Sequence, residues 1–403
     1  MHTPAVDLTL WKMHNDIDFK KVSACTLNRI FSCEPRIATS LITNLGSPEA
    51  VFALDEKQRD SLLGAFSKYR GRLSDAALEQ SARELDRLYS KGFEFLAFGG
   101  KGYPEKLKNC PDAPAGLYVR SSSPASSLFP DGRTDIAVVG TRDISPYGME
   151  WTKRIVASLC SSPSRPVIVS GLAIGVDIVA HSRALECGCA TIAVLPCGIE
   201  EVLPRSHCRD AGRIAAFPGG ALVTDFPPGS DTFKGSFVKR NRIIAGLSDA
   251  TVLVESRIRG GGMITARLAF EYGREVFALP GRIDDSRSEG CNLLLRKKIA
   301  EPIVSLSDLM VSLSLGKGRR RDTAGLEGSV RSRFEGKLPP AETDTLVRVA
   351  VAIAGNRGAD IETLSGLCSE SYRNISAAVG MLEMEGFVSV DLMQRCCIVP
   401  EID

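Results

Sequence analysis

The sequence predicts an α/β protein with an extended, doubly wound and mostly parallel sheet, preceded by a helical domain and followed by a winged-helix domain. Three observations predict this. From residue 136 onward, short β-branched runs alternate with helical segments, an order that produces parallel crossovers. The runs are continuously apolar, as strands covered on both faces should be. At 403 residues the chain is longer than one ordinary domain, so two or three domains are expected.

Residues 1–98 are predicted to form the N-terminal helical domain, of the SAM or helix-hairpin-helix kind. Ser47 followed by Pro48 is a helix start, with a capping hydroxyl and then a proline at the first helical position. A longer helical stretch runs from Asp75 to Tyr89. No residue cluster here carries chemistry, so a small bundle that packs on the next domain is favoured over an independent binding role.

Residues 99–313 are predicted to form the sheet domain. The serine-rich segment 121–134 is expected to be a flexible connection. Six strands are expected after it, at residues 136–139, 167–169, 191–195, 221–224, 251–254 and 275–279.

Residues 314–340 are predicted to be a flexible basic linker, because G-K-G-R-R-R at 316–321 is followed by further glycines and two prolines. Residues 341–403 predict three helices and a short β-hairpin, the outline of a winged helix. Its presumed recognition helix, residues 370–383, holds one arginine, Arg373, against two glutamates. That is a poor surface for phosphate, so docking of a protein is favoured over binding of duplex DNA.

The composition excludes several classes of protein. An apolar fraction of 44% and a charged fraction of 24% are typical of a globular chain with a core. The formal net charge is +2, so any basic site must be local. No apolar run reaches the ~18 residues of a membrane span, and the start of the chain lacks a secretory signal, so a cytoplasmic protein with no membrane partner is expected. No C-x-x-C pair occurs, so the cysteine-rich segment 187–208 is not expected to bind metal.

The carboxyl edge of the predicted sheet is where a ligand is expected, because ligands of open parallel sheets bind where strands end and helices begin. Glycine lets a backbone approach a ligand closely, and at a helix start it places N–H groups and the positive end of the helix dipole there. An anionic ligand with phosphates is therefore favoured over tight turns alone. All six predicted strand ends carry glycine, at Gly140, Gly171 with Gly175, Gly198, Gly229, Gly260 to Gly262, and Gly281.

The usual nucleotide motifs are missing from this edge. The segment after the first predicted strand lacks G-x-G-x-x-G, and the chain holds no G-x-x-x-x-G-K-[ST], so no dinucleotide or ATP cofactor is expected. Asp177 and His181 are four residues apart and could form an acid–base pair. A hydrogen bond on one helix face is the commoner role of such a pair.

The segment 233–242 has the composition of a single-strand binding site. It contains four cations, two aromatic residues and no acid. Lysine and arginine neutralise backbone phosphates, and aromatic faces accept stacked bases without demanding a sequence. The alternative is a solvated basic face with two phenylalanines in the core. Its closeness to the glycine-lined edge favours a polymeric phosphate as ligand.

Several motifs, in unbroken order, resemble those of the DprA (Smf) DNA-processing proteins. They are V-G-T-R at 139–142 with S-P-Y-G at 145–148, S-G-L-A-I-G-V-D at 170–177, R-N-R-I-I-A-G-L-S at 240–248, G-R-E-V-F-A-L-P-G at 273–281 and S-E-G-C-N at 288–292. The resemblance implies an extended Rossmann-like fold and a non-catalytic, homodimeric protein. Such a protein protects incoming single-stranded DNA in natural transformation and homologous recombination and loads the RecA recombinase onto it.

Arg142 and Arg240 are, by this resemblance, the expected phosphate contacts, with Asn241 and Arg242 beside them. Lys234, Phe237 and Lys239 are added on composition. The full expected binding set is Gly140, Thr141, Arg142, Ser170, Gly171, Lys234, Phe237, Lys239, Arg240, Asn241, Arg242, Gly261, Gly262 and Thr265.

The sequence departs from the family pattern at four places without losing a cation. They are 261–263, where the family has S-G-S, 224–225 in place of S-E, 203–204 in place of Y-P, and 237–238 in place of F-P. The change at 203–204 removes an aromatic residue, so base stacking is not expected there.

Two other functions are alternatives to single-strand binding. Phosphoribohydrolases that resemble lysine decarboxylase use P-G-G-x-G-T-x-x-E, and the segment 259–265 is similar to its start. Leu268 stands where that enzyme has its glutamate, so the acid–base group is missing. A duplex-binding regulator acting through residues 341–403 is disfavoured by the acidic recognition helix.

Overall fold

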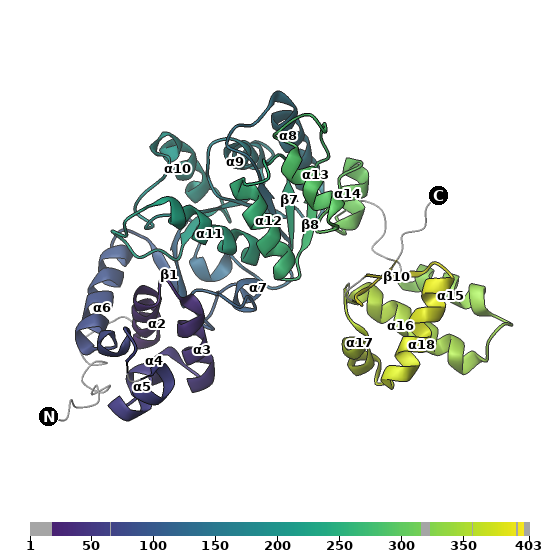
Figure 1. Ribbon diagram of the computed structural model, residues 1–403, viewed down its shortest axis with the longest axis horizontal. Coiled ribbons are helices and arrows are strands. Elements are labelled where there is room, and N and C mark those ends of the chain that lie inside the picture. Colours follow the sequence, from purple (N-terminus) through teal and green to yellow (C-terminus); the bar gives the residue numbers. More distant parts are fainter. Residues whose placement is uncertain (1–17, 65, 316–322, 357, 392–393, 399–403) are drawn as a thin grey trace. The chain divides into compact units, whose positions relative to one another are not determined.

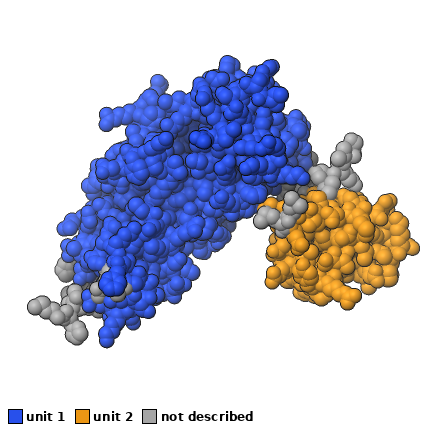
Figure 2. Space-filling model, in the orientation of Figure 1, with its two compact units in different colours: residues 1–316 blue, residues 317–403 orange. Residues whose placement is uncertain are grey.

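The structure is a computed structural model that describes residues 18–64, 66–315, 323–356, 358–391 and 394–398. The chain divides into two units, residues 1–316 and 317–403 (Figure 2). Each unit is described by itself below.

The first unit is built on a nine-stranded sheet within the described residues (Figure 1). The strand order is β1-β2-β6-β5-β4-β3-β7-β8-β9. Strands from β6 to β9 in that order are parallel, while β2 pairs with β6, and β1 with β2, in antiparallel fashion. The strands are β1 (Glu94–Ala97), β2 (Gly116–Arg120), β3 (Asp135–Val139), β4 (Val167–Ser170), β5 (Thr191–Val194), β6 (Ala221–Thr224), β7 (Ala250–Leu253), β8 (Glu275–Ala278) and β9 (Glu301–Pro302).

The predicted α/β class and the six predicted strands, β3 to β8, are confirmed to within one residue at either end. Their side chains are buried on both faces, except Glu275 at the start of β8, which explains the continuous apolar runs. The sequence analysis did not predict β1, β2 and β9. The antiparallel pair lies at one edge of the sheet and the two-residue β9 at the other.

Helices cover both faces of the sheet (Figure 1). Apolar side chains of α8, α9 and α14 share one core with β3, β7 and β8, whereas those of α11, α12 and α13 join the core on the other face. The helices of this part are α7 (Glu105–Lys108), α8 (Pro146–Ser161), α9 (Val176–Glu186), α10 (Cys208–Ala216), α11 (Lys234–Leu247), α12 (Gly261–Glu271), α13 (Glu289–Arg296) and α14 (Leu306–Ser312), with 3-10 turns η2 (Ala125–Ser127) and η3 (Arg205–His207).

The N-terminal helices share the larger core with the sheet and belong to the same unit. The Ser47 hydroxyl accepts a hydrogen bond from the Ala50 amide at 3.2 Å, so the expected helix start is confirmed. The Asn28 side-chain amide donates to the Asp225 carbonyl at 2.7 Å, which ties this bundle to the end of β6. The elements are α2 (Phe19–Ile30), α3 (Pro35–Leu45), α4 (Pro48–Phe52), α5 (Glu56–Leu63), η1 (Arg70–Arg72) and α6 (Asp75–Tyr89).

Residues 121–134 are ordered, so the prediction of a flexible connection is wrong. The Ser122 amide donates to the Ala215 carbonyl at 2.7 Å, and the Ser121 hydroxyl donates to the Gly220 carbonyl at 2.6 Å. Ala125 and Leu128 are buried. The serines here satisfy backbone carbonyls of a neighbouring loop, a use that composition does not reveal.

The second unit contains the three predicted helices and the hairpin, together with one helix that was not predicted. Its elements are α15 (Thr323–Phe334), α16 (Pro340–Gly355), α17 (Ile361–Cys368), α18 (Tyr372–Met384), β10 (Val388–Val390) and β11 (Cys396–Ile398). Helix α15 falls inside the predicted linker 314–340, and its Val330 and Phe334 are buried in the core of this unit. The linker prediction is therefore wrong for residues 323–334, where apolar residues at helical spacing cover α16; residues 316–322 lie outside the described ranges. Within those ranges, every helix is too short or too polar to cross a bilayer.

Candidate nucleic-acid interface

The candidate site lies at the carboxyl ends of β3 and β7. From β3 the chain winds outward through β4, β5 and β6, and then returns to place β7 on the other side of β3. This reversal is a topological switch point, where open α/β sheets leave a crevice for ligands. The loops that meet there follow β3 and β7, and the first turn of α11 contributes to it as well.

Arg142 is the exposed cation at the centre of this edge. Its guanidinium carbon lies 4.8 Å from the centroid of the Phe237 ring on α11. The aromatic face holds the guanidinium plane through a cation–π contact, leaving its N–H groups free to bind an anion. Arg142 and Phe237, both predicted, are brought together from segments almost a hundred residues apart.

The N-terminus of α12 opens beside the loop after β3. Its first residue Gly261 is exposed, and its N-cap Gly260 makes no side-chain capping bond. The Asn241 side-chain amide donates to the Gly261 carbonyl at 3.3 Å, which links α11 to this turn. A Cβ on Gly262 would lie 3.1 Å from the Gly140 Cα, so glycine at both positions permits the close approach of the two loops. Uncapped N–H groups and the helix dipole suit an anion here.

Helix α11 begins with an exposed aromatic residue and an exposed lysine. The Phe233 side chain is 67% exposed, and its ring occupies the space that a Cβ on Gly235 would fill. Lys234 is exposed as well. Lys239 is engaged differently, because its ammonium lies 3.6 Å from the Asp225 carboxylate and 4.7 Å from the Phe226 ring centroid. Lys234 is therefore available to a phosphate, whereas Lys239 has partners within the protein.

Arg240 does not present its charge to a ligand, contrary to the prediction that it contacts phosphate. Its side chain is buried, and one guanidinium nitrogen donates to the carbonyls of Gly171 and, at 2.6 Å, Val194. Burial, together with the nearby Arg142 charge, lowers the pKa of Arg240 to about 10, while the charge of Asp177 opposes that shift. Arg240 therefore joins the ends of β4 and β5 from inside the protein.

Arg242 is likewise internal, which corrects its expected place in the binding set. It is 5% exposed, forms an ion pair with Asp225 and donates to the Asp112 carbonyl. Asp225 is itself 2% exposed. Two of the four cations in the segment 233–242 are thus structural.

The backbone amides of the loop after β4 are hydrogen-bonded to a carboxylate of the protein itself. The Asp177 carboxylate accepts hydrogen bonds from the amides of Gly171 at 3.1 Å and Ala173 at 3.3 Å. A Cβ on Gly171 would overlap the Arg240 guanidinium, so glycine here makes room for a side chain of the protein rather than for a ligand. The Ser170 hydroxyl donates to the Val138 carbonyl at 2.7 Å. Ser170 and Gly171 are buried, and their predicted contact with a strand does not fit this arrangement.

The N-terminus of α8 also holds a carboxylate of the protein. Glu255 is 1% exposed and accepts from the Ser145 amide at 2.9 Å and from the Ser145 hydroxyl. A Cβ on Gly148 would overlap that carboxylate. The sequence motif S-P-Y-G thus builds a pocket for Glu255, and α8 offers no vacant anion site.

Asp177 and His181 form neither an acid–base pair nor the expected hydrogen bond on one helix face. His181 Nδ1 lies 2.7 Å from the Thr191 hydroxyl, whose own hydrogen goes to the Ile168 carbonyl, so Nδ1 is the donor. Burial, with the charge of Arg240, lowers the pKa of His181 to about 3. The imidazole is a neutral core group.

The predicted binding residues divide by exposure. Arg142, Lys234 and Gly261 are exposed, and a second group is half-buried: Gly140, Thr141, Phe237 and Lys239. The rest are buried: Ser170, Gly171, Arg240, Asn241, Arg242, Gly262 and Thr265. Phe233 is not among the predicted binding residues, although it lies in the acid-free segment 233–242.

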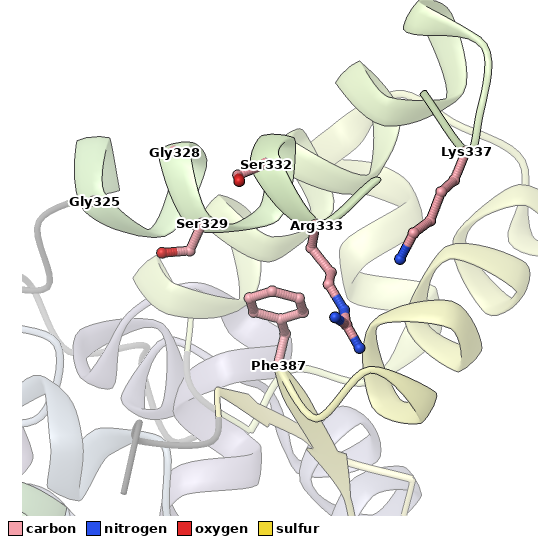
Figure 3. A pocket seen from close by; sticks show the side chains of 7 residues that line it. All are labelled: Gly325, Gly328, Ser329, Ser332, Arg333, Lys337 and Phe387. Atoms are coloured by element: carbon pink, nitrogen blue, oxygen red, sulfur yellow. The ribbon is translucent and has the colours of Figure 1, made fainter. Parts of the chain in front are cut away.

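A second concave surface lies in the C-terminal unit (Figure 3). One face of α15 lines it with small residues, the Arg333 side chain lies beside the Phe387 ring, and Lys337 lines the surface farther from that ring (Figure 3). Arg333 is paired with Glu385. Among the described residues no group of three or more His, Cys, Asp and Glu side chains could hold a metal ion.

Comparison with known proteins identifies the sheet domain. The model of the family described as DNA recombination-mediator protein A matches residues 94–314. Protein Smf of Escherichia coli is 40% identical over 214 residues, which are 52% of this chain and 55% of that protein. Protein Smf of Synechocystis is 30% identical over 326 residues, or 76% of this chain and 80% of that one. The X-ray structure of DNA processing protein A from Streptococcus pneumoniae superposes with a TM-score of 0.57 at 27% identity, covering 73% of this chain and 98% of that one.

Proposed function

Because the chain belongs to the DNA recombination-mediator protein A family, we propose that it binds single-stranded DNA at the carboxyl edge between β3 and β7, without catalysing a reaction. The observation that supports this most is the exposed Arg142 guanidinium, held over Phe237 beside the uncapped start of α12. A fixed guanidinium and a row of backbone amides bind the sugar-phosphate chain and demand no base sequence.

Both the phosphate and the base of a nucleotide have binding partners at this edge. Arg142, Lys234 and the first amides of α12 bind phosphates, and the exposed Phe233 ring stacks on a base. The buried carboxylates of the edge, Glu255, Asp177 and Asp225, are each bonded to amides or cations of the protein. That leaves them unsuited to acid–base work and favours binding over catalysis.

The wider role follows from the family. The protein protects incoming single strands, loads the RecA recombinase onto them in natural transformation or homologous recombination, and acts as a homodimer in the cytoplasm. Membership of the family supports these steps, while the geometry of the edge supports the contact with DNA.

Arg142→Ala tests the proposal through fluorescence anisotropy with a dT oligomer over a salt titration. We expect the affinity to fall about tenfold and the log–log salt slope to decrease by about 0.7, the value for one lost single-strand phosphate contact. Arg154→Ala is the control, because Arg154 on α8 is another exposed stacked arginine, with its guanidinium carbon 4.3 Å from the Trp151 ring centroid, but it is paired with Glu150. Equal losses in the two variants, or equal affinity for duplex and single strand, would contradict the proposed site.

A further inference from the structure

Asp143 forms ion pairs with two arginines that come from two other loops. Its Oδ2 lies 3.4 Å from the Arg257 guanidinium after β7 and 3.3 Å from the Arg287 guanidinium after β8. The three side chains are partly open to solvent, at 59% for Asp143, 61% for Arg257 and 34% for Arg287. Isolated surface pairs are weak and common, but two guanidiniums from separate loops that converge on one carboxylate oxygen are a more specific arrangement.

Hydrogen bonds position the Arg287 side chain and the backbone next to Arg257. Arg287 donates through Nε to the Asp143 carbonyl at 3.0 Å, and its own carbonyl accepts from the Ser256 amide at 2.7 Å. Ser256 directly precedes Arg257. The backbone of Arg287 is therefore hydrogen-bonded to the residue before Arg257, beside the end of β7. A second acid, Asp285, is 3.9 Å from Arg287. The Arg287 guanidinium is thus held in advance of any ligand, which lowers the entropy lost when it binds one.

From this geometry we infer a second phosphate subsite, formed by Arg257 and Arg287, which the Asp143 carboxylate occupies until a DNA phosphate displaces it. A carboxylate and a phosphate offer the same kind of acceptor oxygens to guanidinium forks. The inference rests on the proposed function, because Asp143 directly follows Arg142. The bound strand then passes from the Arg142 contact across the end of β7 toward the loop after β8.

Exposed apolar side chains on the same loops indicate that the ligand carries bases. Ile258 is 47% exposed next to Arg257, and Ile283 is 95% exposed in the loop that holds Arg287. Tyr147 is 44% exposed, and its hydroxyl donates to the Pro280 carbonyl at 3.0 Å, so its ring stands beside that loop. Cations interspersed with apolar faces are typical of grooves that follow a single strand.

The double variant Arg257→Gln/Arg287→Gln tests the subsite with dT oligomers of about 4 to 16 nucleotides. We expect the affinity for the long oligomers to fall about fivefold and the salt slope to decrease by about 0.7, with little change for the shortest ones, which the site around Arg142 retains. Arg282→Gln is the control, because Arg282 is 80% exposed in the same loop but pairs with Asp284. An equal effect of the control, or an effect that does not depend on length, overturns the inference.

Asp143→Asn tests the displacement directly. We expect binding of long oligomers to tighten about two- to fivefold, because the competing carboxylate is gone, and Asp284→Asn to change it less. In the Arg257→Gln/Arg287→Gln background, Asp143→Asn should have no further effect. If it still tightens binding there, the gain is a general charge effect and the inference is wrong. This comparison does not depend on small differences in stability among the variants.

Two further readouts separate the alternatives. Inorganic phosphate at matched ionic strength should not compete beyond the salt effect; stronger competition would assign the arginines to a free anion and contradict a DNA subsite. If Arg142→Ala leaves binding unchanged, the proposed function itself fails. If Arg142→Ala weakens binding while Arg257→Gln/Arg287→Gln does not, only the second subsite is refuted.

Discussion

The carboxyl edge of the sheet has two halves that are alike in sequence and opposite in structure. The closed half comprises the ends of β4, β5 and β6, where Arg240, Arg242 and Asp177 bond to the protein itself. The open half comprises the ends of β3, β7 and β8, where Arg142 and Gly261 face solvent. Both halves are rich in glycine and arginine.

The difference shows that the same residue types can face solvent or bond to groups of the protein itself. In the closed half, Gly171 leaves space for the internal Arg240 guanidinium. In the open half, Gly140 and Gly262 let two loops approach closely, and the N-cap Gly260 leaves the start of α12 without a side-chain cap. The closed half is bonded internally, and the open half is where we propose that a polyanion binds.

The largest expected effect is on the free energy of unfolding, and it comes from a substitution in the closed half. Arg240→Ala removes the donor for the Gly171 and Val194 carbonyls and leaves Asp177 without its cation, so the free energy of unfolding should fall by about 3–5 kcal/mol. Urea unfolding measures this. Under conditions where the variant is folded, its salt slope for dT binding should equal that of the unsubstituted protein. A normal stability with a reduced slope would place Arg240 in the DNA site after all.

Acid should destabilise the closed half through His181. Its folded pKa of about 3 lies below the unfolded value of 6.5, so only the unfolded chain takes up the proton as the pH falls below about 6.5. Stability is therefore lost with falling pH, by about 2 kcal/mol between pH 7 and pH 5. Urea unfolding at several pH values measures the loss, and His181→Gln should remove that part of the dependence. A persistent slope in the variant would assign the proton to another group.

A smaller effect compares two lysines of α11. Lys234→Ala, at the exposed start of α11, should weaken dT binding about threefold and lower the salt slope by about 0.7. Lys239→Ala should leave the slope nearly unchanged, because Lys239 already pairs with Asp225. Anisotropy titrations at several salt concentrations measure both. Equal slopes for the two variants would show that exposure does not decide which cation binds.

The smallest expected effect concerns the second unit. Removal of residues 317–403 should leave the affinity for single strands within about threefold, because the candidate site lies wholly in the first unit. The cut belongs before α15 and not at residue 341, since Val330 and Phe334 are part of the core of the second unit. A large loss of affinity would assign that unit a direct contact with DNA.

The sequence by itself determined the α/β class and the six central strands. Their continuous apolar runs are a local consequence of burial on both faces, so they can be read without the fold. It also located the edge, because glycine at strand ends and the acid-free segment 233–242 are local patterns. Lys234 and Phe237 were predicted in this way, whereas Arg142 was predicted from the resemblance of its V-G-T-R motif.

Only the tertiary structure decided which cations face outward. Arg240 and Arg142 are the same type of residue. The carbonyls that accept hydrogen bonds from Arg240 lie at the ends of β4 and β5, about 70 and 46 positions away along the chain. The helix inside the predicted linker and the ordered serine segment 121–134 have the same origin, since their partners are distant in sequence. Burial depends on what packs against a residue, and that is a property of the fold rather than of any window of the sequence.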